Sequence, residues 1–419
     1  MIVNLDELKK PCSCKKNHDI SVDQIIIEAG AIKALPELIK QYAPQGGTIT
    51  MICDDNTYQA AGHMVENLVE NLYIVKLPSE DLHANEIAVD QTAALLPEDS
   101  ALFLAVGSGT IHDITRYLAW KNNTPFISVP TAASVDGYVS TVAAMTWYGF
   151  KKTLTAVAPV CVLADTDIFM KAPYRLTASG ISDLLGKYTA IADWRISHLV
   201  TKEYICERVC DLESQALETV CNNIEAIRQG SKEGYEQLMY GLILSGLAMQ
   251  MVGNSRPASG SEHHFSHFWE MEIINPPLPY YHGEKVGVGL ALASKVYHET
   301  KEQIRKGISL KPYEGIEKEL IYKLFNPKNL YEEILKENEA DPLKEIDLDA
   351  FQEKLGAIAD IIEEIPSPEK IIEILQAAGA LYKLEDIGLD ASAYDISVQA
   401  SCYVRNRLTF MRIRKLLDL

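Results

Sequence analysis

The stretch ALFLAVGSGTIHD, residues 101–113, joins a strand, a glycine turn and the start of a helix. Its apolar run ALFLAV is typical of a buried strand, Gly107-Ser108-Gly109 is expected to form the turn, and Thr110 begins the helix. Glycines let the backbone approach a diphosphate closely, and the N–H groups at a helix start face an anion. Because the same turn joins strand to helix in many proteins without a ligand, the rest of the chain must decide its meaning.

The alternation of strand and helix extends from residue 24 to about residue 165. The strand-like runs are short, rich in Val, Ile and Leu, and separated by amphipathic helical patterns. The other runs are QIIIEAG (24–30), TITMICDD (48–55), NLYIVKLP (71–78), TPFISVPTAAS (124–134) and CVLADTDIF (161–169). This pattern predicts a doubly wound α/β domain with a parallel sheet over residues 1–170.

The pattern changes after residues 172–176, where helical periodicity dominates and no convincing strand follows. The apolar run at residues 238–253 is shorter than a bilayer needs and contains Ser245 and Gln250, so we interpret it as a buried helix. We therefore expect an all-helical second domain over residues 171–419. A ligand should lie in the crevice between the two domains, at the carboxyl ends of the strands.

The composition narrows the range of partners. A net charge of −19 over 419 residues argues against nucleic acid, because phosphate backbones require a basic face, although one local cationic cluster could still bind a small anion. The eight cysteines are scattered, which indicates reduced thiols, and the N-terminal MIVNLDELKK lacks the apolar core of a secretory signal. These features predict a cytoplasmic protein that does not insert into a membrane.

Polar side chains stand where other strands of the predicted sheet end. After one strand come Asp54 and Asp55, where a carboxylate can accept hydrogen bonds from an adenosine ribose and repel a 2′-phosphate. Another strand is followed by the segment PTAAS, residues 130–134, which could instead be an ordinary turn that caps a helix. Three polar strand ends on one rim nevertheless favour a dinucleotide cleft. The polar residues at the end of that strand, which would line the cleft, are Thr131, Ser134, Asp136 and Tyr138.

An otherwise apolar helix is predicted around Asp183 and Lys187, which are four residues apart and would share a face. Such a pair is usually a surface ion pair. If the face points inward, however, the carboxylate must be paired or bind a metal to offset its lost hydration. Asp183 is therefore a candidate metal ligand.

Four of the ten histidines gather in the neighbouring segments GSEHHFSHFWEME and HGEKVG. On a helix His263 and His267 would project together, whereas His264 would point about 100° away. One carboxylate and two imidazoles, with positions open for substrate, suit a catalytic divalent metal. Spacing alone leaves open which two of His263, His267 and His282 are the ligands.

These motifs together resemble the sn-glycerol-1-phosphate dehydrogenase family. It belongs to the superfamily of glycerol dehydrogenase, iron-containing alcohol dehydrogenases and dehydroquinate synthase. The match runs in order from about residue 50 to 295, and its motifs are GSGTIHD (107–113), PTAASVDGY (130–138), SGISDLLGKYTAIADW (179–194), SGSEHHFSH (259–267) and HGEKVG (282–287). The resemblance implies an N-terminal dinucleotide-binding domain, a helical C-terminal domain and one divalent metal.

The resemblance also assigns roles by position. It implies that Asp183, His263 and His282 bind the metal, that His267, Asp136 and Asp183 form the catalytic and substrate-contacting set, and that Asp54 meets the adenosine. Further cofactor contacts are implied for Gly107, Gly109, Thr110, Ile111, His112, Asp113, Thr131, Ala132, Ala133, Ser134 and Ser140. The segment INPPLPYYH (274–282) and the charged residues 305–350 have no place on the family pattern.

The implied reaction is reduction of glycerone phosphate by NADH or NADPH to sn-glycerol 1-phosphate, and its reverse. A Zn, Ni or Fe ion would act as a Lewis acid on the carbonyl, and His267, or a water that it holds, would deliver the proton. Lys187 and Arg256 are candidate partners of the substrate phosphate, although either could be a structural ion pair. We also expect a homo-oligomer.

Three alternatives compete with this function. Glycerol dehydrogenase is the nearest, because it shares the cleft and the metal but acts on an uncharged diol, so a cationic phosphate pocket separates the two. A lyase resembling dehydroquinate synthase would need more basic residues around the metal. A protein that had lost catalysis would bind metal and nucleotide without turnover.

Overall fold

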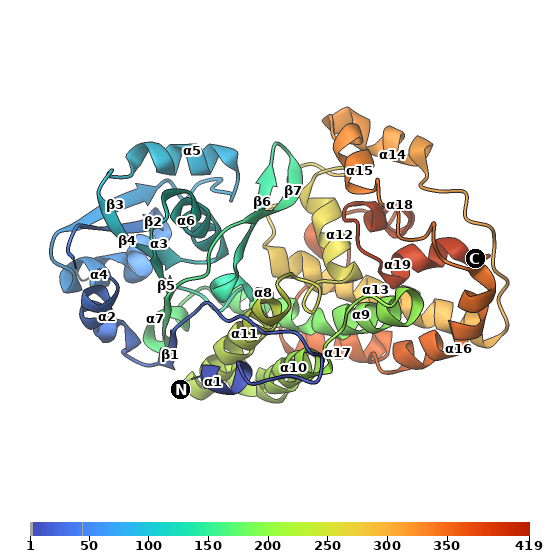
Figure 1. Ribbon diagram of the computed structural model, residues 1–419, viewed down its shortest axis with the longest axis horizontal. Coiled ribbons are helices and arrows are strands. Elements are labelled where there is room, and N and C mark those ends of the chain that lie inside the picture. The colour runs from blue at the N-terminus through green and yellow to red at the C-terminus, as the bar shows by residue number, and fades with distance from the viewer. Residues whose placement is uncertain (1–2, 44) are drawn as a thin grey trace. The chain divides into compact units, whose positions relative to one another are not determined.

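Figure 1 shows the computed structural model, which describes residues 3–43 and 45–419. Contacts divide the chain into two compact units: unit 1 comprises Met1–Leu184 and Glu218–Asn254, and unit 2 comprises Leu185–Leu217 and Ser255–Leu419. Unit 1 thus takes in helical segments from beyond residue 170. A functional boundary at residue 170 stays a prediction.

The centre of unit 1 is a six-stranded sheet in which every neighbouring pair is parallel. All six strands coincide with apolar runs that the sequence predicted, so the parallel sheet is confirmed. In spatial order they are β1 (Gln24–Glu28), β8 (Cys161–Asp165), β5 (Phe126–Pro130), β4 (Ser100–Gly107), β2 (Thr48–Asp54) and β3 (Leu72–Leu77).

Helices cover both faces of this sheet because successive strand residues point to opposite sides. Met51 and Leu104 join one apolar core with α2 (Leu35–Tyr42), α4 (His63–Leu68) and α7 (Thr166–Phe169). Ile52 and Phe103 join the other core with α5 (Glu86–Leu95) and α6 (Gly109–Asn122). Unit 1 is therefore doubly wound, as predicted.

A hairpin of β6 (Val142–Trp147) and β7 (Phe150–Thr155) was not predicted from the sequence. Its two turn residues, Tyr148 and Gly149, both have positive φ, 50° and 78°. Such two-residue turns match the twist of an antiparallel pair, so the Tyr-Gly dipeptide between two alternating runs was the missed signal.

Helices account for the regular structure that follows β8 in the described chain. The expected buried helix is α11 (Lys232–Val252), and no described helix is long and apolar enough to cross a membrane. Gly186 separates α8 (Tyr174–Leu185) from α9 (Lys187–Thr201), so Asp183 and Lys187 do not share one continuous helix as expected. The remaining α-helices before residue 310 are α1 (Leu5–Leu8), α3 (Asp55–Thr57), α10 (Glu207–Arg228), α12 (Ser261–Glu270) and α13 (His282–Arg305).

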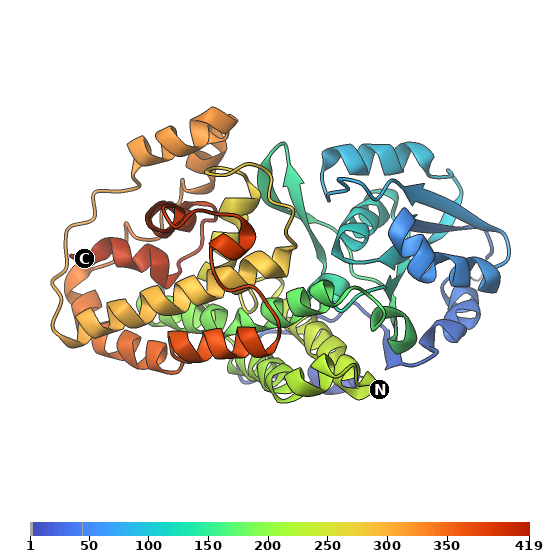
Figure 2. The ribbon, with the colours of Figure 1, turned by 180° about the vertical axis from the view of Figure 1, so that it is seen from behind.

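Unit 2 is built around α12 and α13. They approach so closely that a Cβ on Gly289 would lie 2.4 Å from the Glu262 carbonyl oxygen, so this contact requires glycine. Figure 2 shows α13 running beside the later helices α16 and α17, which it contacts. The helices after residue 310 are α14 (Lys318–Phe325), α15 (Tyr331–Glu337), α16 (Leu348–Glu363), α17 (Pro368–Ala377), α18 (Ala393–Ala400) and α19 (Phe410–Ile413). The charged segment 305–350 includes α14 and α15.

Candidate active site

The glycine turn of unit 1 has the geometry expected of an anion-binding loop. β4 ends at Gly107, Ser108 is the N-cap residue, and α6 begins at Gly109. A Cβ on Gly107 would lie only 2.5 Å from the Ile111 Cβ, so the tight turn into the helix requires glycine there. The Thr131 N–H donates to the Gly107 carbonyl at 2.9 Å, which ties this turn to the segment after β5.

His112 and the neighbouring Arg116 stabilise the same region from inside. The buried His112 ring bridges the Ser108 carbonyl at 2.9 Å and the Ser128 hydroxyl at 2.7 Å. Burial, and then the nearby Arg116 charge, lower the pKa of His112 to about 3, so this ring is neutral at physiological pH. Arg116 donates to the carbonyls of Gly137 and Ser140 at 2.5 and 2.9 Å. Both side chains therefore organise the loops that are predicted to meet the cofactor.

Asp54 ends β2, as predicted, but its carboxylate also caps a helix. Its Oδ1 accepts the Thr57 N–H at 2.8 Å, and the Thr57 hydroxyl accepts the Asp54 N–H at 2.9 Å. Asp55 pairs with Lys76 at 3.3 Å on the surface. The capping contact gives Asp54 a structural role at the start of α3. A contact of Asp54 with a ribose stays a prediction.

The segment after β5 joins two of the predicted catalytic carboxylates. The Asp136 N–H donates to Asp183 Oδ2 at 3.0 Å, and the Ser245 hydroxyl donates to Asp136 Oδ2 at 3.0 Å. Asp183 is buried on α8. A Cβ on Gly180, one turn earlier, would lie 2.1 Å from the Ala133 carbonyl oxygen, so α8 packs directly on Thr131–Ser134.

Three of the four clustered histidines meet in unit 2. Ring centroids of His263 and His282 are 5.1 Å apart, and His267 lies 6.0 Å from His263 and 5.9 Å from His282. His264 is fully buried on α12, where burial and the charges of nearby arginines hold its pKa well below the usual value. His263 and His267 thus lie close together, as their spacing on a helix predicted.

Each of two histidines also contacts a carboxylate. His263 Nδ1 is 2.7 Å from Glu262 Oε1, and His282 Nδ1 is 2.8 Å from Glu270 Oε1. Burial alone would raise the pKa of Glu262, but hydrogen bonds from His263, Thr189 and Gly260 outweigh it, and the pKa is lowered. Glu262 is therefore ionised at neutral pH and can only accept hydrogen bonds.

Within unit 2, potential ligand atoms of His267, Glu270 and His282 lie within 4.8 Å of one another. Carboxylate oxygen and imidazole nitrogen are donors that Zn, Ni and Fe accept. The residues present thus fit a divalent metal. Which of these histidines bind a metal together with Asp183 stays a prediction.

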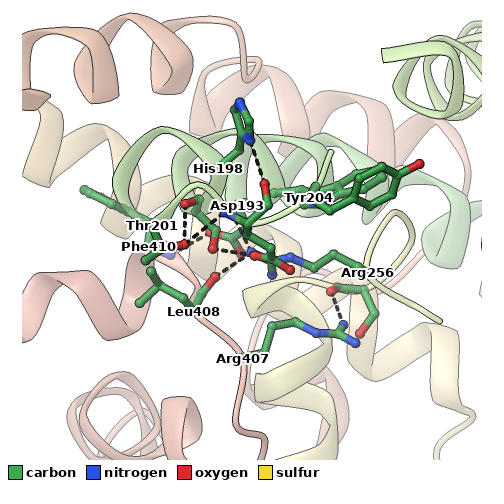
Figure 3. Close-up of polar contacts among 12 residues, drawn as sticks. Asp193, His198, Thr201, Tyr204, Arg256, Arg407, Leu408 and Phe410 are labelled. Carbon is green, nitrogen blue, oxygen red and sulfur yellow. Dashed lines mark hydrogen bonds and ion pairs between the residues drawn. The ribbon is translucent and has the colours of Figure 1, made fainter. Parts of the chain in front are cut away.

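The two predicted phosphate partners are both buried. Lys187 begins α9 and is fully buried. Arg256 donates through Nη2 to the carbonyls of Asp193 at 3.1 Å and Leu408 at 2.7 Å (Figure 3). The same atom pairs with Glu203 at 3.1 Å. These contacts give Arg256 a structural role, and its contact with substrate stays a prediction.

Sequence reasoning missed Ser245, Glu262 and Glu270. Ser245 was noted only as a polar residue in an apolar helix, although a polar group that must be buried needs a partner. Glu262 immediately precedes the first histidine, and a carboxylate beside a potential ligand could have pointed to it. Glu270 is distant from His282 in sequence, so only the fold brings them together.

The N-terminal cysteines, predicted to be reduced thiols, have a histidine neighbour. Cys14 Sγ lies 3.3 Å from His18 Nε2, and His18 Nδ1 is 2.7 Å from the Met251 carbonyl. All eight cysteines are free thiols. The histidine contacts fasten the N-terminal segment to the end of α11.

Comparison with known proteins places these features in a family. Residues 26–173 match the family model described as iron-containing alcohol dehydrogenase. A glycerol-1-phosphate dehydrogenase [NAD(P)+] of Geobacillus thermodenitrificans is 34% identical over 419 residues, covering 97% of this chain and 96% of its own. An enzyme of the same name from Thermococcus kodakarensis is 34% identical and covers 66% of this chain and 80% of its own.

Solved structures share the fold at lower sequence identity. A probable glycerol dehydrogenase from Sinorhizobium meliloti has a TM-score of 0.62 and 17% identity, covering 92% of this chain and 90% of that chain. At that identity the likeness concerns the fold alone, which is the predicted two-part architecture. On the near full-length match to the Geobacillus protein, this chain belongs to the glycerol-1-phosphate dehydrogenase family, within the iron-containing alcohol dehydrogenase group.

Proposed function

We propose that this protein catalyses the NAD(P)-linked, metal-dependent reduction of glycerone phosphate to sn-glycerol 1-phosphate, and the reverse oxidation. The observation that carries the proposal is 34% identity over 97% of the chain to a protein named glycerol-1-phosphate dehydrogenase [NAD(P)+]. The gathering of His263, His267 and His282 in unit 2, with Glu270 beside His282, supports it, because imidazole and carboxylate donors suit a divalent metal at a catalytic centre.

Asp183, His263 and His282 would hold the metal. When bound, a divalent ion of this kind supplies Lewis-acid polarisation of a carbonyl group. Asp183 Oδ2 accepts the Asp136 N–H, which fixes the plane of its carboxylate. The carboxylate contacts on His263 and His282 leave the Nε2 atom of each ring to face a ligand.

Asp136 and His267 would orient the substrate and handle the proton. The Ser245 hydroxyl fixes Asp136 Oδ2, so this carboxylate is oriented to accept a hydrogen bond from a substrate hydroxyl. His267 lies within 6.0 Å of both candidate ligand histidines, measured between ring centroids. A protonated imidazole there can donate a proton to the oxygen that becomes the new hydroxyl, directly or through a water.

The glycine turn and the segment after β5 would bind the nucleotide. The start of α6 offers backbone N–H groups to a diphosphate, and Arg116 holds the carbonyls of Gly137 and Ser140 in place. When bound, a reduced nicotinamide supplies the hydride. The cofactor contacts proposed for this region are Gly107, Gly109–Asp113, Thr131–Ser134, Ser140 and, at the adenosine end, Asp54.

Several finer points stay predictions. They are the identity of the metal, the choice between NAD and NADP, phosphate contacts of Lys187 and Arg256, a homo-oligomer, a cytoplasmic location and the exclusion of nucleic acid. The net charge of −19 supports the last of these.

The decisive experiment compares two substrates that differ only in the phosphate. The metal is removed with a chelator and restored as Zn²⁺, Ni²⁺ or Fe²⁺, and NADH oxidation is followed with equal concentrations of glycerone phosphate and dihydroxyacetone. We expect metal-dependent turnover of the phosphate ester and little turnover of dihydroxyacetone. A preference for dihydroxyacetone would indicate a glycerol dehydrogenase, and turnover of neither substrate would refute the proposal.

A further inference from the structure

Two carboxylates of α12, the buried Glu262 and the partly buried Glu270, have no part in the mechanism above. Glu262 and Glu270 lie in the same helix as His263 and His267, and neither belongs to the proposed ligand set with Asp183. Each contacts the Nδ1 atom of one proposed ligand histidine. Their placement therefore bears on how the two rings are oriented.

The position of Glu262 is fixed from three sides. Its Oε1 accepts the Gly260 N–H at 2.6 Å and contacts His263 Nδ1 at 2.7 Å, while Thr189 donates to Oε2. A Cβ on Gly260 would lie 2.9 Å from Glu262 Oε2, so the absence of a side chain there leaves room for this carboxylate. Glu262 is fully buried and cannot swing away to solvent.

Glu270 holds the second ring from the other end of the same helix. Its Oε1 lies 2.8 Å from His282 Nδ1 and accepts the Ser266 hydroxyl at 3.3 Å. His282 is the first residue of α13, so this contact joins the end of one helix to the start of the next. The side chain of Glu270 is only 9% exposed, which limits competition from water.

We propose that Glu262 and Glu270 are positioning residues that fix the tautomer and orientation of His263 and His282 for metal binding. Each carboxylate oxygen lies at hydrogen-bond distance from Nδ1, so in this arrangement a neutral ring carries its proton on Nδ1 and donates it to the carboxylate. The lone pair of Nε2 is then presented on the opposite side of each ring. A metal-binding histidine commonly has such an outer partner, whose loss weakens binding about 10- to 100-fold.

This inference rests on the metal set of the proposed function, and it is tested by metal binding instead of turnover. Full-length protein freed of metal is titrated with Zn²⁺ in competition with a chromophoric chelator. We expect the Kd for Zn²⁺ to rise about 10- to 100-fold in Glu270→Ala and by less in Glu270→Gln, because the amide oxygen can still accept from Nδ1. The visible spectrum of the Co²⁺-loaded protein should change in both variants.

Glu272→Gln is the matched control. Glu272 lies two residues beyond Glu270 and pairs with Lys328 at 3.1 Å on the surface, so this change removes the same charge without touching a histidine. Its Zn²⁺ affinity and Co²⁺ spectrum should match those of the parent protein. Glu262→Gln gives an independent test at His263, and if that variant does not fold, the Glu270 variants still decide.

The outcomes are separable from those of the proposed function. Zn²⁺ affinity within twofold of the parent in folded Glu270→Ala would overturn the inference, as would a parent protein that binds no divalent metal. Weakened binding in the variants of a parent that does not reduce glycerone phosphate would support the positioning role while refuting the proposed function.

Discussion

The contact between α8 and the segment after β5 gives a sharp prediction for Gly180→Ala. The new Cβ would lie 2.1 Å from the Ala133 carbonyl oxygen and 2.9 Å from its carbon, and both are backbone atoms that cannot rotate away. Since real Cβ contacts stay above 3.0 Å, α8 and Thr131–Ser134 must separate by roughly 0.9 Å. The change should therefore disturb the proposed cofactor loop and Asp183 together.

The magnitude follows from two opposing effects. Overpacking of a tight interior costs about 1–3 kcal/mol, and a fixed backbone oxygen places this site near the upper end. Replacing glycine by alanine inside a helix returns about 1 kcal/mol. We expect the free energy of unfolding to fall by about 2 kcal/mol, measured by urea denaturation with circular dichroism.

Gly356→Ala provides the control, because Gly356 is exposed within α16 and a Cβ there would meet nothing within 4 Å. It should stabilise the protein by up to about 1 kcal/mol. NADH binding, followed by fluorescence, should weaken in Gly180→Ala and stay unchanged in Gly356→Ala. A Gly180→Ala protein whose stability lies within about 0.5 kcal/mol of the parent would refute the reasoning.

Four further predictions test other parts of the site. Ser245→Ala removes the donor to Asp136 Oδ2, a bond to a charged group worth about 1.5 kcal/mol or more, so kcat/KM for glycerone phosphate should fall about tenfold; an unchanged value would exclude the orienting role. Burial and the Arg116 charge lower the pKa of His112 to about 3, whereas a histidine in the unfolded chain takes up its proton near pH 6.5. The free energy of unfolding should therefore fall as the pH falls from about 6.5 towards 3. His112→Gln should make this pH dependence weaker, as measured by urea denaturation at several pH values. Arg256→Lys removes the three hydrogen bonds that Nη2 donates and should lower the urea concentration at the midpoint of unfolding. If the KM of this variant rises for glycerone phosphate but not for dihydroxyacetone, Arg256 also contacts the substrate phosphate. A metal that binds only the folded protein should raise the free energy of unfolding by about 2.7 kcal/mol when its concentration is 100 times Kd, and removing the metal should abolish this gain. Equal stability with and without metal would show that the folded protein has no such site.

The strands of unit 1 were predictable because each is buried on both faces and so reads as a continuous apolar run. The hairpin at β6 and β7 was not predicted, since its burial is partial and its alternating pattern is weak beside the strong runs on either side. The helix break at Gly186 was also missed, because the apolar pattern continues across it without a proline or a polar cluster.

The candidate site was predictable where its residues are close in sequence. His263 and His267 share a helix face by spacing, and the family resemblance supplied Asp183 and His282. Spacing could not choose between the three histidines, because the choice depends on where α13 begins relative to α12. The ring separations and the contact of His282 with Glu270 exist only once these two helices are packed.

The sequence by itself determined the α/β class of the first part, the helical character of the second and the residue types of the site. These properties follow from local periodicity and short-range spacing, which the chain carries before it folds. Tertiary structure alone decided that Glu270 contacts His282 and that Ser245 holds Asp136. Hydrogen bonds between residues far apart in the chain depend on packing to within a fraction of an ångström, and no local pattern encodes that.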